Sequence, residues 1–333
     1  MITGAAGCIG SCLTKRLLSL REHVIAFDKH FRPSGLFLDK TDNLRIAFGD
    51  LAQKELLLSI TKDVDIVFHL AAKVHEIPKN REEESEFFKV NVEGTKILLD
   101  SCLANRVSKF IFFSTVGTFE ERNGASIDER SPVLPLSAYA RSKYEAENLV
   151  LDYHQKYGLA VTILKLPVVY GPHDKGNVKR MIESIDRGQF RIIGNGGNLK
   201  SMLYVENAVD AAILVAKDNK ANGKVYIVSD NAPYSIREIA VAIAAELGVP
   251  LSRIHLPKWF AYAMGFLCDM IRKITKVSLP LSRDAVKKLT MNTVVSAKSI
   301  KRELGFEPRF SLKEGMAITI DWHKSVKSTL QNN

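Results

Sequence analysis

Tyr139 and Lys143 are the two residues of this chain whose types and spacing could carry out acid–base chemistry. Residues at i and i+4 share one face of a helix, so the phenol and the ammonium would lie close together. A neighbouring ammonium favours tyrosinate and lowers the pKa of the tyrosine, which would then exchange a proton with a hydroxyl near neutral pH. The same spacing occurs by chance on surface helices, so its meaning depends on the elements around it.

A glycine-rich loop at residues 3–10 predicts a second site, for a dinucleotide. Glycines allow a tight turn and close approach to a pyrophosphate, and the following helix presents its positive end. Such a pattern alone is also typical of a plain turn. The predicted contacts from this loop are Gly4, Gly7, Cys8, Ile9 and Gly10.

The acidic residue that should bind the adenosine ribose is Asp28, at the end of the next predicted strand. Its distance from the loop is close to the expected spacing of about 20 residues. A carboxylate there repels a 2′-phosphate and favours NAD, while Lys29 and Arg32 leave NADP open.

The elements that must position these residues alternate between strand and helix. Continuous β-branched or aromatic runs predict buried strands at 23–28, 44–48, 64–70, 109–114 and 161–166. Helical patterns lie between them at 12–20, 84–105 and 139–157. This alternation predicts an α/β fold, a Rossmann-type doubly wound parallel sheet.

The second half of the chain is mostly helical, with helices predicted at 178–187, 205–217, 235–247, 259–274 and 296–304. We therefore predict a cofactor-binding domain at 1–172 and a smaller substrate-binding lobe at 173–333, some segments of which return to the sheet. Only Met1 and Ile2 precede the glycine loop, where a strand of about five residues is expected. This favours a shortened first strand, or a native chain that starts upstream.

Composition limits the function classes. The 333 residues are 46% hydrophobic and 25% charged, as in ordinary globular proteins, and the longest apolar runs fall short of the ~18 residues of a membrane span. A net charge of +10 suits an anionic partner such as a nucleotide, a nucleic acid or an acidic membrane, but its spread along the chain favours a solvated surface. A chain that opens on a cofactor loop predicts no signal peptide and a cytoplasmic protein. The four cysteines lack metal-ligand spacing and are expected to be reduced, and no metal is predicted.

Further motifs complete a resemblance to a known family. Asp50, the Leu-Ala-Ala at 70–72, Asn91-x-x-Gly-Thr95, Ser114-Thr115 and residues 166–172 accompany the loop and the Tyr139/Lys143 pair. Together they resemble the extended short-chain dehydrogenases of the NAD-dependent epimerase/dehydratase family. That resemblance implies Tyr139, Lys143 and Thr115 as catalytic residues, Thr115 by hydrogen bonding to the reacting oxygen.

The resemblance also implies further contacts. Those with the cofactor are Asp50, Leu51, Leu70, Ala71, Ala72, Asn91, Ser114, Tyr139, Lys143, Leu166, Val168 and Val169. Those with the substrate are Thr115, Asn177 and Lys200. For Asp50 a helix N-cap is the alternative, and for Lys200 it is a solvated loop lysine.

Departures from the family pattern narrow the reaction. Dehydratases and decarboxylases of the family carry an acid directly after the catalytic Ser/Thr, where this chain has Val116 and Gly117. Residues 115–119 also lack the cysteine used by reductases that epimerise beside a ketone. What remains is a nucleotide-sugar 4-epimerase, a 4-keto-sugar reductase or another alcohol dehydrogenase. The usual R-x-G-D-like diphosphate motif is missing from 276–295, which argues against a conventional UDP-hexose 4-epimerase.

The apolar stretch at 257–276, with its basic end, fits either a buried lobe helix or an interfacial helix resting on anionic lipid. The interfacial helix would keep a 3β-hydroxysteroid-like or other lipid alcohol dehydrogenase as the alternative function. It would also allow the protein to lie at the inner face of the membrane.

Our leading hypothesis is a nucleotide-sugar enzyme of surface polysaccharide synthesis that binds no nucleic acid. A non-catalytic dinucleotide sensor has no need of Tyr139, Lys143 and Thr115 together. The family habit implies a homodimer through 84–105 and 139–157.

Overall fold

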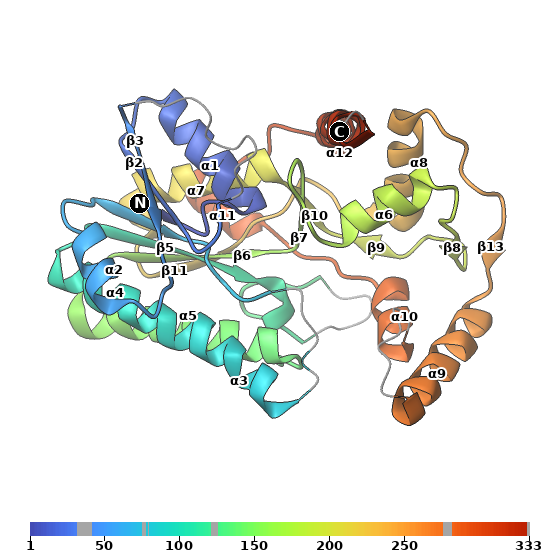
Figure 1. Ribbon diagram of the computed structural model, residues 1–333, viewed down its shortest axis with the longest axis horizontal. Helices are drawn as coiled ribbons and strands as arrows, with labels where there is room; N and C mark the ends of the chain where they lie inside the picture. The colour runs from blue at the N-terminus through green and yellow to red at the C-terminus, as the bar shows by residue number, and fades with distance from the viewer. Residues whose placement is uncertain (32–41, 75–77, 79, 121–125, 276–281, 332–333) are drawn as a thin grey trace.

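A seven-stranded parallel sheet forms the centre of the computed structural model, which describes residues 1–31, 42–74, 78, 80–120, 126–275 and 282–331. Its strand order is β11-β6-β5-β4-β1-β2-β3 (Figure 1). The strands are β1 (Ile2–Thr3), β2 (Val24–Asp28), β3 (Leu44–Phe48), β4 (Ile66–His69), β5 (Lys109–Thr115), β6 (Val161–Leu166) and β11 (Lys224–Ile227). The predicted Rossmann-type sheet is confirmed.

Helices cover both faces of this sheet. Helices α1 (Cys8–Ser19), α7 (Val205–Lys217) and α11 (Lys298–Leu304) lie over one face, and α2 (Lys54–Ile60), α4 (Gly94–Ala104) and α5 (Ala138–Tyr157) lie over the other (Figure 1). The sequence of β5 is a continuous apolar run because both faces of this strand are covered by helices. Ile111 and Phe113 pack into the first layer, whereas Phe110 and Phe112 pack into the second.

The rest of the chain builds a lobe at the carboxyl ends of the strands. Its helices are α6 (Asn177–Asp186), α8 (Ile236–Leu247), α9 (Lys258–Thr275), α10 (Arg283–Thr290) and α12 (Leu312–Gln331). Its short strands are β7 (Val168–Tyr170), β8 (Ile192–Ile193), β9 (Leu199–Lys200), β10 (Met202–Tyr204), β12 (Tyr234–Ser235) and β13 (His255–Leu256). Strand β11 pairs with β6 and α7 packs on α1, so residues of the second half do return to the sheet. The division at residue 172 stays a prediction.

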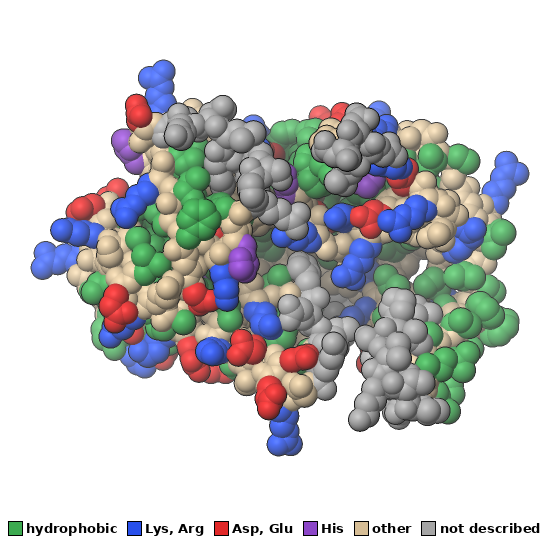
Figure 2. Space-filling model, in the orientation of Figure 1, with side chains coloured by type: hydrophobic (Ala, Val, Ile, Leu, Met, Phe, Trp, Pro, Cys, Tyr) green, Lys and Arg blue, Asp and Glu red, His purple; other side chains and the backbone are tan. Residues whose placement is uncertain are grey.

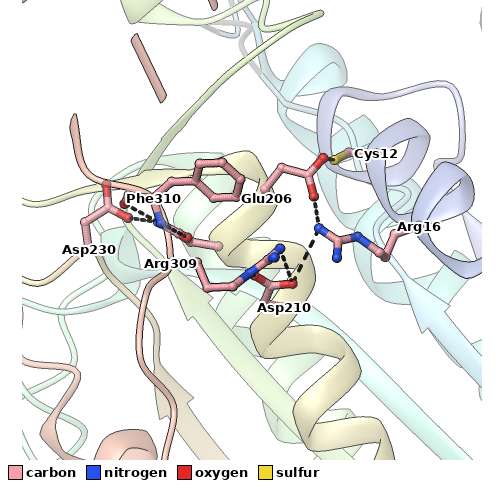
Figure 3. A network of polar contacts seen from close by, with 8 residues as sticks. Cys12, Arg16, Glu206, Asp210, Asp230, Arg309 and Phe310 are labelled. Carbon is pink, nitrogen blue, oxygen red and sulfur yellow. Dashed lines mark hydrogen bonds and ion pairs between the residues drawn. The ribbon is translucent and has the colours of Figure 1, made fainter. Parts of the chain in front are cut away.

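A polar network joins the lobe to the sheet layer through α7 (Figure 3). Glu206 on α7 accepts hydrogen bonds from the Cys12 thiol and the Arg16 guanidinium of α1, at 2.9 and 2.6 Å. One turn further, Asp210 accepts two hydrogen bonds from Arg309, at 2.6 and 3.0 Å. Helix α7 therefore holds α1 on one side and the segment before α12 on the other.

The predicted helical stretch at 84–105 is present, but one turn within it is not α-helical. Helix α3 (Arg81–Phe88) and α4 are separated by one π-helical turn at Lys89–Glu93. A π turn widens the helix locally and is frequent at functional sites. Here it carries Asn91, which is buried. Helix α1 also begins four residues earlier than predicted, directly from the glycine loop.

Within the parts of the chain that the structure describes, none of the helices combines the length and apolar content that a bilayer crossing requires.

Candidate active site

The glycine loop lies between β1 and α1, and its backbone geometry requires glycine. Gly4 has φ +71°, and a Cβ there would lie 2.7 Å from the backbone nitrogen of Ala71. At Gly10 a Cβ would lie 2.2 Å from the Gly4 carbonyl oxygen. The loop is thus packed against the segment after β4. Because α1 begins at Cys8, first-turn N–H groups face out of the helix end, as pyrophosphate binding needs.

Asp28 is held at the end of β2, beside this loop. Its carboxylate accepts hydrogen bonds from the backbone N–H of Ala6 at 2.9 Å and of His30 at 3.0 Å. The neighbouring Lys29 forms an ion pair with Asp50, with 2.9 Å between Nζ and Oδ2. Lys29 is therefore engaged by another carboxylate, and Arg32 lies outside the described residues.

The helix-cap interpretation of Asp50 is wrong. The N-cap of α2 is Gln53, whereas the Asp50 carboxylate accepts from the backbone N–H of Ala52 at 2.9 Å. This hydrogen bond and the Lys29 ammonium hold the pKa of Asp50 below its ordinary value. Leu51 beside it is buried, and its side chain packs where a Cβ on Gly94 would lie.

A buried histidine at the end of β4 fixes the segment that carries Leu70, Ala71 and Ala72. His69 Nδ1 lies 2.7 Å from the Thr3 hydroxyl, and Nε2 lies 2.9 Å from the Thr95 hydroxyl. Thr95 donates its hydrogen to the Asn91 carbonyl oxygen, so it can only accept from His69. Burial lowers the pKa of His69 to about 3, so the ring is neutral. Nε2 therefore carries the hydrogen and Nδ1 accepts from Thr3. Sequence reasoning did not single out His69.

Asn91, in the π turn, ties three parts of the site together. Its amide oxygen accepts from the backbone N–H of Lys73 at 2.7 Å, and its amide nitrogen donates to the Lys73 carbonyl at 3.2 Å. The same nitrogen donates to the hydroxyl of Ser142 at 2.9 Å. Ser142 lies on α5 between Tyr139 and Lys143. Asn91 thus connects the segment after β4 to the helix that carries the predicted catalytic pair.

Tyr139 and Lys143 lie on the first turns of α5, which starts at a capping serine. The Ser137 hydroxyl accepts from the backbone N–H of Ala140 at 3.1 Å. Lys143 is only 2% exposed, with its ammonium 3.9 Å from the centre of the Phe112 ring. Burial lowers the pKa of Lys143 to about 7.

The expected lowering of the tyrosine pKa is wrong for the protein alone. Burial and the Glu147 carboxylate raise the pKa of Tyr139 to about 12. Both effects disfavour a phenolate, because desolvation and a nearby negative charge each cost the anion stability. In this environment Tyr139 is a neutral phenol at pH 7.

Sequence reasoning missed Glu147 on α5 and Lys165 on β6, which form a buried ion pair. Their charged atoms are 2.8 Å apart and each side chain is 5% exposed. Glu147 also accepts a hydrogen bond from Ser114, and Lys165 donates to Thr118 at 2.8 Å. Burial raises the pKa of Glu147, against the opposing effect of Lys165. The signal was present, because Glu147 follows Lys143 by one helical turn and Lys165 interrupts an apolar strand.

Thr115 ends β5 where the chain turns toward the lobe. It pairs with Leu166 across the β5–β6 ladder. Its hydroxyl oxygen accepts from the backbone N–H of Gly117 at 3.1 Å. The ladder therefore brings Thr115 beside the segment of Val168 and Val169, which forms β7. These are positions at the carboxyl ends of parallel strands, where ligands bind in open α/β sheets.

The two predicted substrate contacts lie on lobe elements. Asn177 is exposed at the first position of α6. Lys200, on β9, donates from its ammonium to the Lys288 carbonyl at 2.8 Å and lies 3.0 Å from the Thr293 hydroxyl. The roles of both residues stay predictions.

A family model for the NAD dependent epimerase/dehydratase family matches residues 1–229. The chain belongs to this family. Membership confirms the predicted resemblance and makes this an enzyme of the NAD-dependent, extended short-chain dehydrogenase type. It removes the non-catalytic sensor from consideration.

Relatives of this epimerase/dehydratase family member span several activities. A 2-alkyl-3-oxoalkanoate reductase of Shewanella oneidensis is 27% identical, over 95% of this chain and 84% of the relative. An N-acetyl-α-D-glucosaminyl-diphospho-ditrans,octacis-undecaprenol 4-epimerase of Escherichia coli O157:H7 is also 27% identical, over 97% and 94%. The dTDP-glucose 4,6-dehydratase DesIV from Streptomyces venezuelae, solved with NAD bound, has a TM-score of 0.80 at 25% identity, over 98% and 97%.

NAD fits the family member's own residues. The loop packs closely on itself and on the segment after β4, where Gly4 and Gly10 leave no room for a Cβ, and α1 begins directly after it. Asp28, the predicted ribose contact, lies beside this loop at the end of β2, and the segment after β4 is fixed by His69 and Asn91.

Proposed function

We propose that this enzyme is a nucleotide-sugar 4-epimerase or 4-keto-sugar reductase. It would interconvert a sugar hydroxyl and a ketone with Tyr139, Lys143 and Thr115. The choice of this reaction over the dehydratase reaction of the family rests on the residue after Thr115. Val116 is 7% exposed and packs in an apolar cluster with Phe119, Ile127, Ile227 and Val295. Water elimination needs an acid to protonate the leaving hydroxyl, and this position holds none.

The proposed roles follow from the chemistry of each side chain. Tyr139, neutral at pH 7, donates a proton to the oxygen of a sugar ketone as it is reduced, and takes it back in the reverse direction. Thr115 donates a hydrogen bond to the same oxygen. Lys143, when protonated, stabilises the phenolate that Tyr139 becomes. When bound, the nicotinamide ring takes up or returns the hydride and adds a positive charge near the phenol.

Several observations support NAD and a nucleotide sugar. The Asp28 carboxylate repels a 2′-phosphate, and Lys29 is engaged by Asp50, which leaves it less able to bind one. Relatives named for dTDP-glucose and for a diphospho-undecaprenol sugar act on such diphosphates. Asn177 and Lys200 are the proposed substrate contacts, the latter by exchanging its bonds to the α10 segment for the diphosphate.

A second candidate function is a lipid alcohol dehydrogenase. It is favoured by the apolar side chains that α9 exposes on the lobe. Relatives named 2-alkyl-3-oxoalkanoate reductase and sterol-4-α-carboxylate 3-dehydrogenase also point this way. Detergent-dependent activity on a lipid alcohol would distinguish it from the leading proposal.

We also propose a homodimer through residues 84–105 and 139–157. These helices pack on each other, with the Tyr153 hydroxyl donating to Asp100 at 2.5 Å, and both reach the surface.

The first experiment is to denature the purified protein and assay the released small molecules for nicotinamide cofactor. An epimerase returns the hydride to the same substrate, so it is expected to hold NAD tightly and to release about one NAD per chain. A reductase is expected to yield an empty site with exchangeable, micromolar binding. A panel of UDP- and dTDP-linked hexoses and 4-keto-hexoses then tests the substrate class. Turnover of lipid alcohols in detergent, with none of any nucleotide sugar, would overturn the proposal.

A further inference from the structure

Helix α9 exposes an apolar surface instead of burying it. Of its described side chains, residues 258–271, only Ala261 and Gly265 are buried, and Trp259 is 71% exposed. Figure 2 shows hydrophobic side chains gathered where α9 lies. We call this surface the α9 face; its exposed members are Trp259, Phe260, Tyr262, Met264, Phe266, Leu267, Met270 and Ile271.

Helical spacing places these side chains together. Trp259, Phe266 and Met270 follow i, i+7, i+11, and Phe260, Leu267 and Ile271 repeat that pattern in the adjacent row. On the opposite side, Gly265 packs so tightly on the start of α10 that a Cβ would lie 2.9 Å from the Arg283 backbone nitrogen. The small residues thus fix α9 on α10 and turn the large ones outward.

The charges around this surface are strongly biased. Residues 251–290 contain eight Lys and Arg against two Asp, so about one eighth of the chain supplies six of its ten excess positive charges. Lys258, Lys287 and Lys288 are exposed there. The Arg283 guanidinium lies 5.2 Å from the centre of the Phe266 ring, so cations border the apolar side chains directly. The excess positive charge is therefore concentrated in this segment, and the expectation that it is spread along the chain is wrong.

We propose that the α9 face docks the enzyme on an anionic lipid bilayer. An apolar helical face bordered by lysine and arginine is the pattern of helices that lie in the interface plane, with apolar side chains among the acyl chains and cations at the headgroups. Tryptophan and tyrosine favour that interface because they are amphipathic. An interfacial helix does not need the length of a membrane span, and α9 does not have it.

Charge argues against a second copy of the chain as the occupant. A two-fold dimer places the same surface of each subunit against the other. Docking through the α9 face would therefore oppose two strongly basic segments. The surface also lies apart from α4 and α5, the helices proposed for dimerisation (Figure 1).

Docking in this way would set the substrate lobe, not the cofactor sheet, next to the lipid. Helix α10 is tied to the predicted substrate strand, because Lys200 donates to the Lys288 carbonyl and Asn198 donates to the Leu289 carbonyl, both at 2.8 Å. The membrane-bound enzyme would thus present its substrate side toward the bilayer surface. The proposal does not depend on the reaction catalysed.

The test uses the full-length chain and vesicles of phosphatidylcholine with or without phosphatidylglycerol. The chain has two tryptophans, so Trp322→Phe leaves Trp259 as the only indole reporter. We expect sedimentation with anionic vesicles and a blue shift of Trp259 emission, both weakened by salt. In the background with both tryptophans, Phe266→Ser/Leu267→Ser should reduce the partition coefficient by about tenfold or more. Lys287→Glu/Lys288→Glu should do the same, since each surface cation contributes about a fivefold preference for an anionic leaflet.

Matched controls separate a local effect from a general one. Val241→Ser removes an exposed apolar side chain on α8, and Lys217→Glu/Lys220→Glu reverses two exposed charges at the end of α7. Both should bind vesicles like the wild type, as should Tyr139→Phe. The proposal is overturned if the wild type ignores anionic vesicles, or if α9 variants and controls bind equally. It is also overturned if Phe266→Ser/Leu267→Ser converts a dimer to a monomer without changing vesicle binding. Since binding is measured without substrate, failure here leaves the proposed reaction untouched.

Discussion

At the scale of single residues, the site combines two kinds of buried charge. Lys143 is nearly fully buried, so its ammonium is easily deprotonated. One turn further along α5, Glu147 forms a buried ion pair with Lys165 and accepts a hydrogen bond from the Ser114 hydroxyl. Removing one partner of such a pair leaves an uncompensated buried charge, which is strongly destabilising. The network therefore fixes the end of β5 relative to α5.

Tyr139→Phe tests the proposed proton transfer at this scale. The change removes one hydroxyl from a partly exposed side chain and leaves the ring in place. Turnover should fall by a factor of about 10² or more, while NAD binding stays nearly unchanged. Steady-state kinetics together with a binding titration provide the measurement. A variant that turns over like the wild type would remove Tyr139 from the mechanism.

At the scale of elements, the glycine loop is shaped by contact with another backbone segment. Gly4 needs its left-handed conformation and also lies against the backbone after β4. The π turn at Lys89–Glu93 serves the same region, because it lets Asn91 reach both Lys73 and Ser142. The glycine loop and α5, the helix proposed to carry the catalytic pair, are therefore supported by one connected set of hydrogen bonds.

Gly4→Ala and Gly158→Ala form a matched pair. Their comparison separates the backbone strain of a positive φ from the steric clash of a Cβ with neighbouring backbone. Both positions have φ near +70°, but a Cβ at Gly158, the C-cap of α5, meets nothing within 4 Å. Gly158→Ala should cost about 1 kcal/mol of unfolding free energy and leave NAD binding intact. Gly4→Ala should cost about 3 kcal/mol or more and abolish NAD binding, because the backbone of Ala71 must move. Urea unfolding and NAD titration measure both effects. Equal behaviour of the two variants would contradict the described packing of the loop.

At the scale of the whole molecule, lobe and sheet meet around a buried carboxyl. Asp230 is 5% exposed, and its Oδ1 accepts from Asn207 at 2.8 Å and from the backbone N–H of Tyr204 at 3.2 Å. The Asn207 amide in turn donates to the Phe310 carbonyl oxygen and accepts from the Phe310 backbone N–H. Desolvation raises the pKa of Asp230 from 3.8 to about 6, against these hydrogen bonds.

This raised pKa predicts how stability depends on pH. Below about pH 4 the carboxyl is protonated in both states. Between about pH 4 and 6 the unfolded chain loses the proton first, so the folded state binds more protons and stability falls as pH rises. Asp230→Asn abolishes this titration, so its stability relative to the wild type should improve by roughly 1–3 kcal/mol between pH 4 and 7.

Urea unfolding at several pH values measures the difference. The Asp42→Asn variant is the control for the loss of one exposed carboxylate. A constant difference between Asp230→Asn and the wild type across this range would contradict the buried, raised-pKa carboxyl.

The sequence by itself determined those features of the protein that depend on local pattern. Apolar runs placed β2, β3, β5 and β6 within a residue or so, and the i, i+4 spacing placed Tyr139 and Lys143 on one helix, because these periods are properties of the backbone. The glycine loop and Asp28 were equally readable, since their spacing is set within one β–α–β unit.

Only the tertiary structure decided what depends on residues distant in the chain. The return of β11 to the sheet, the partners of the Lys200 ammonium and the Glu147–Lys165 pair all join segments far apart in sequence. The pKa of Tyr139 rises where local reasoning expected it to fall, because burial and the Glu147 carboxylate both disfavour the phenolate. The outward direction of the α9 face follows from where α10 packs. Periodicity specifies which side of a helix is apolar, but only the assembled chain specifies what that side meets.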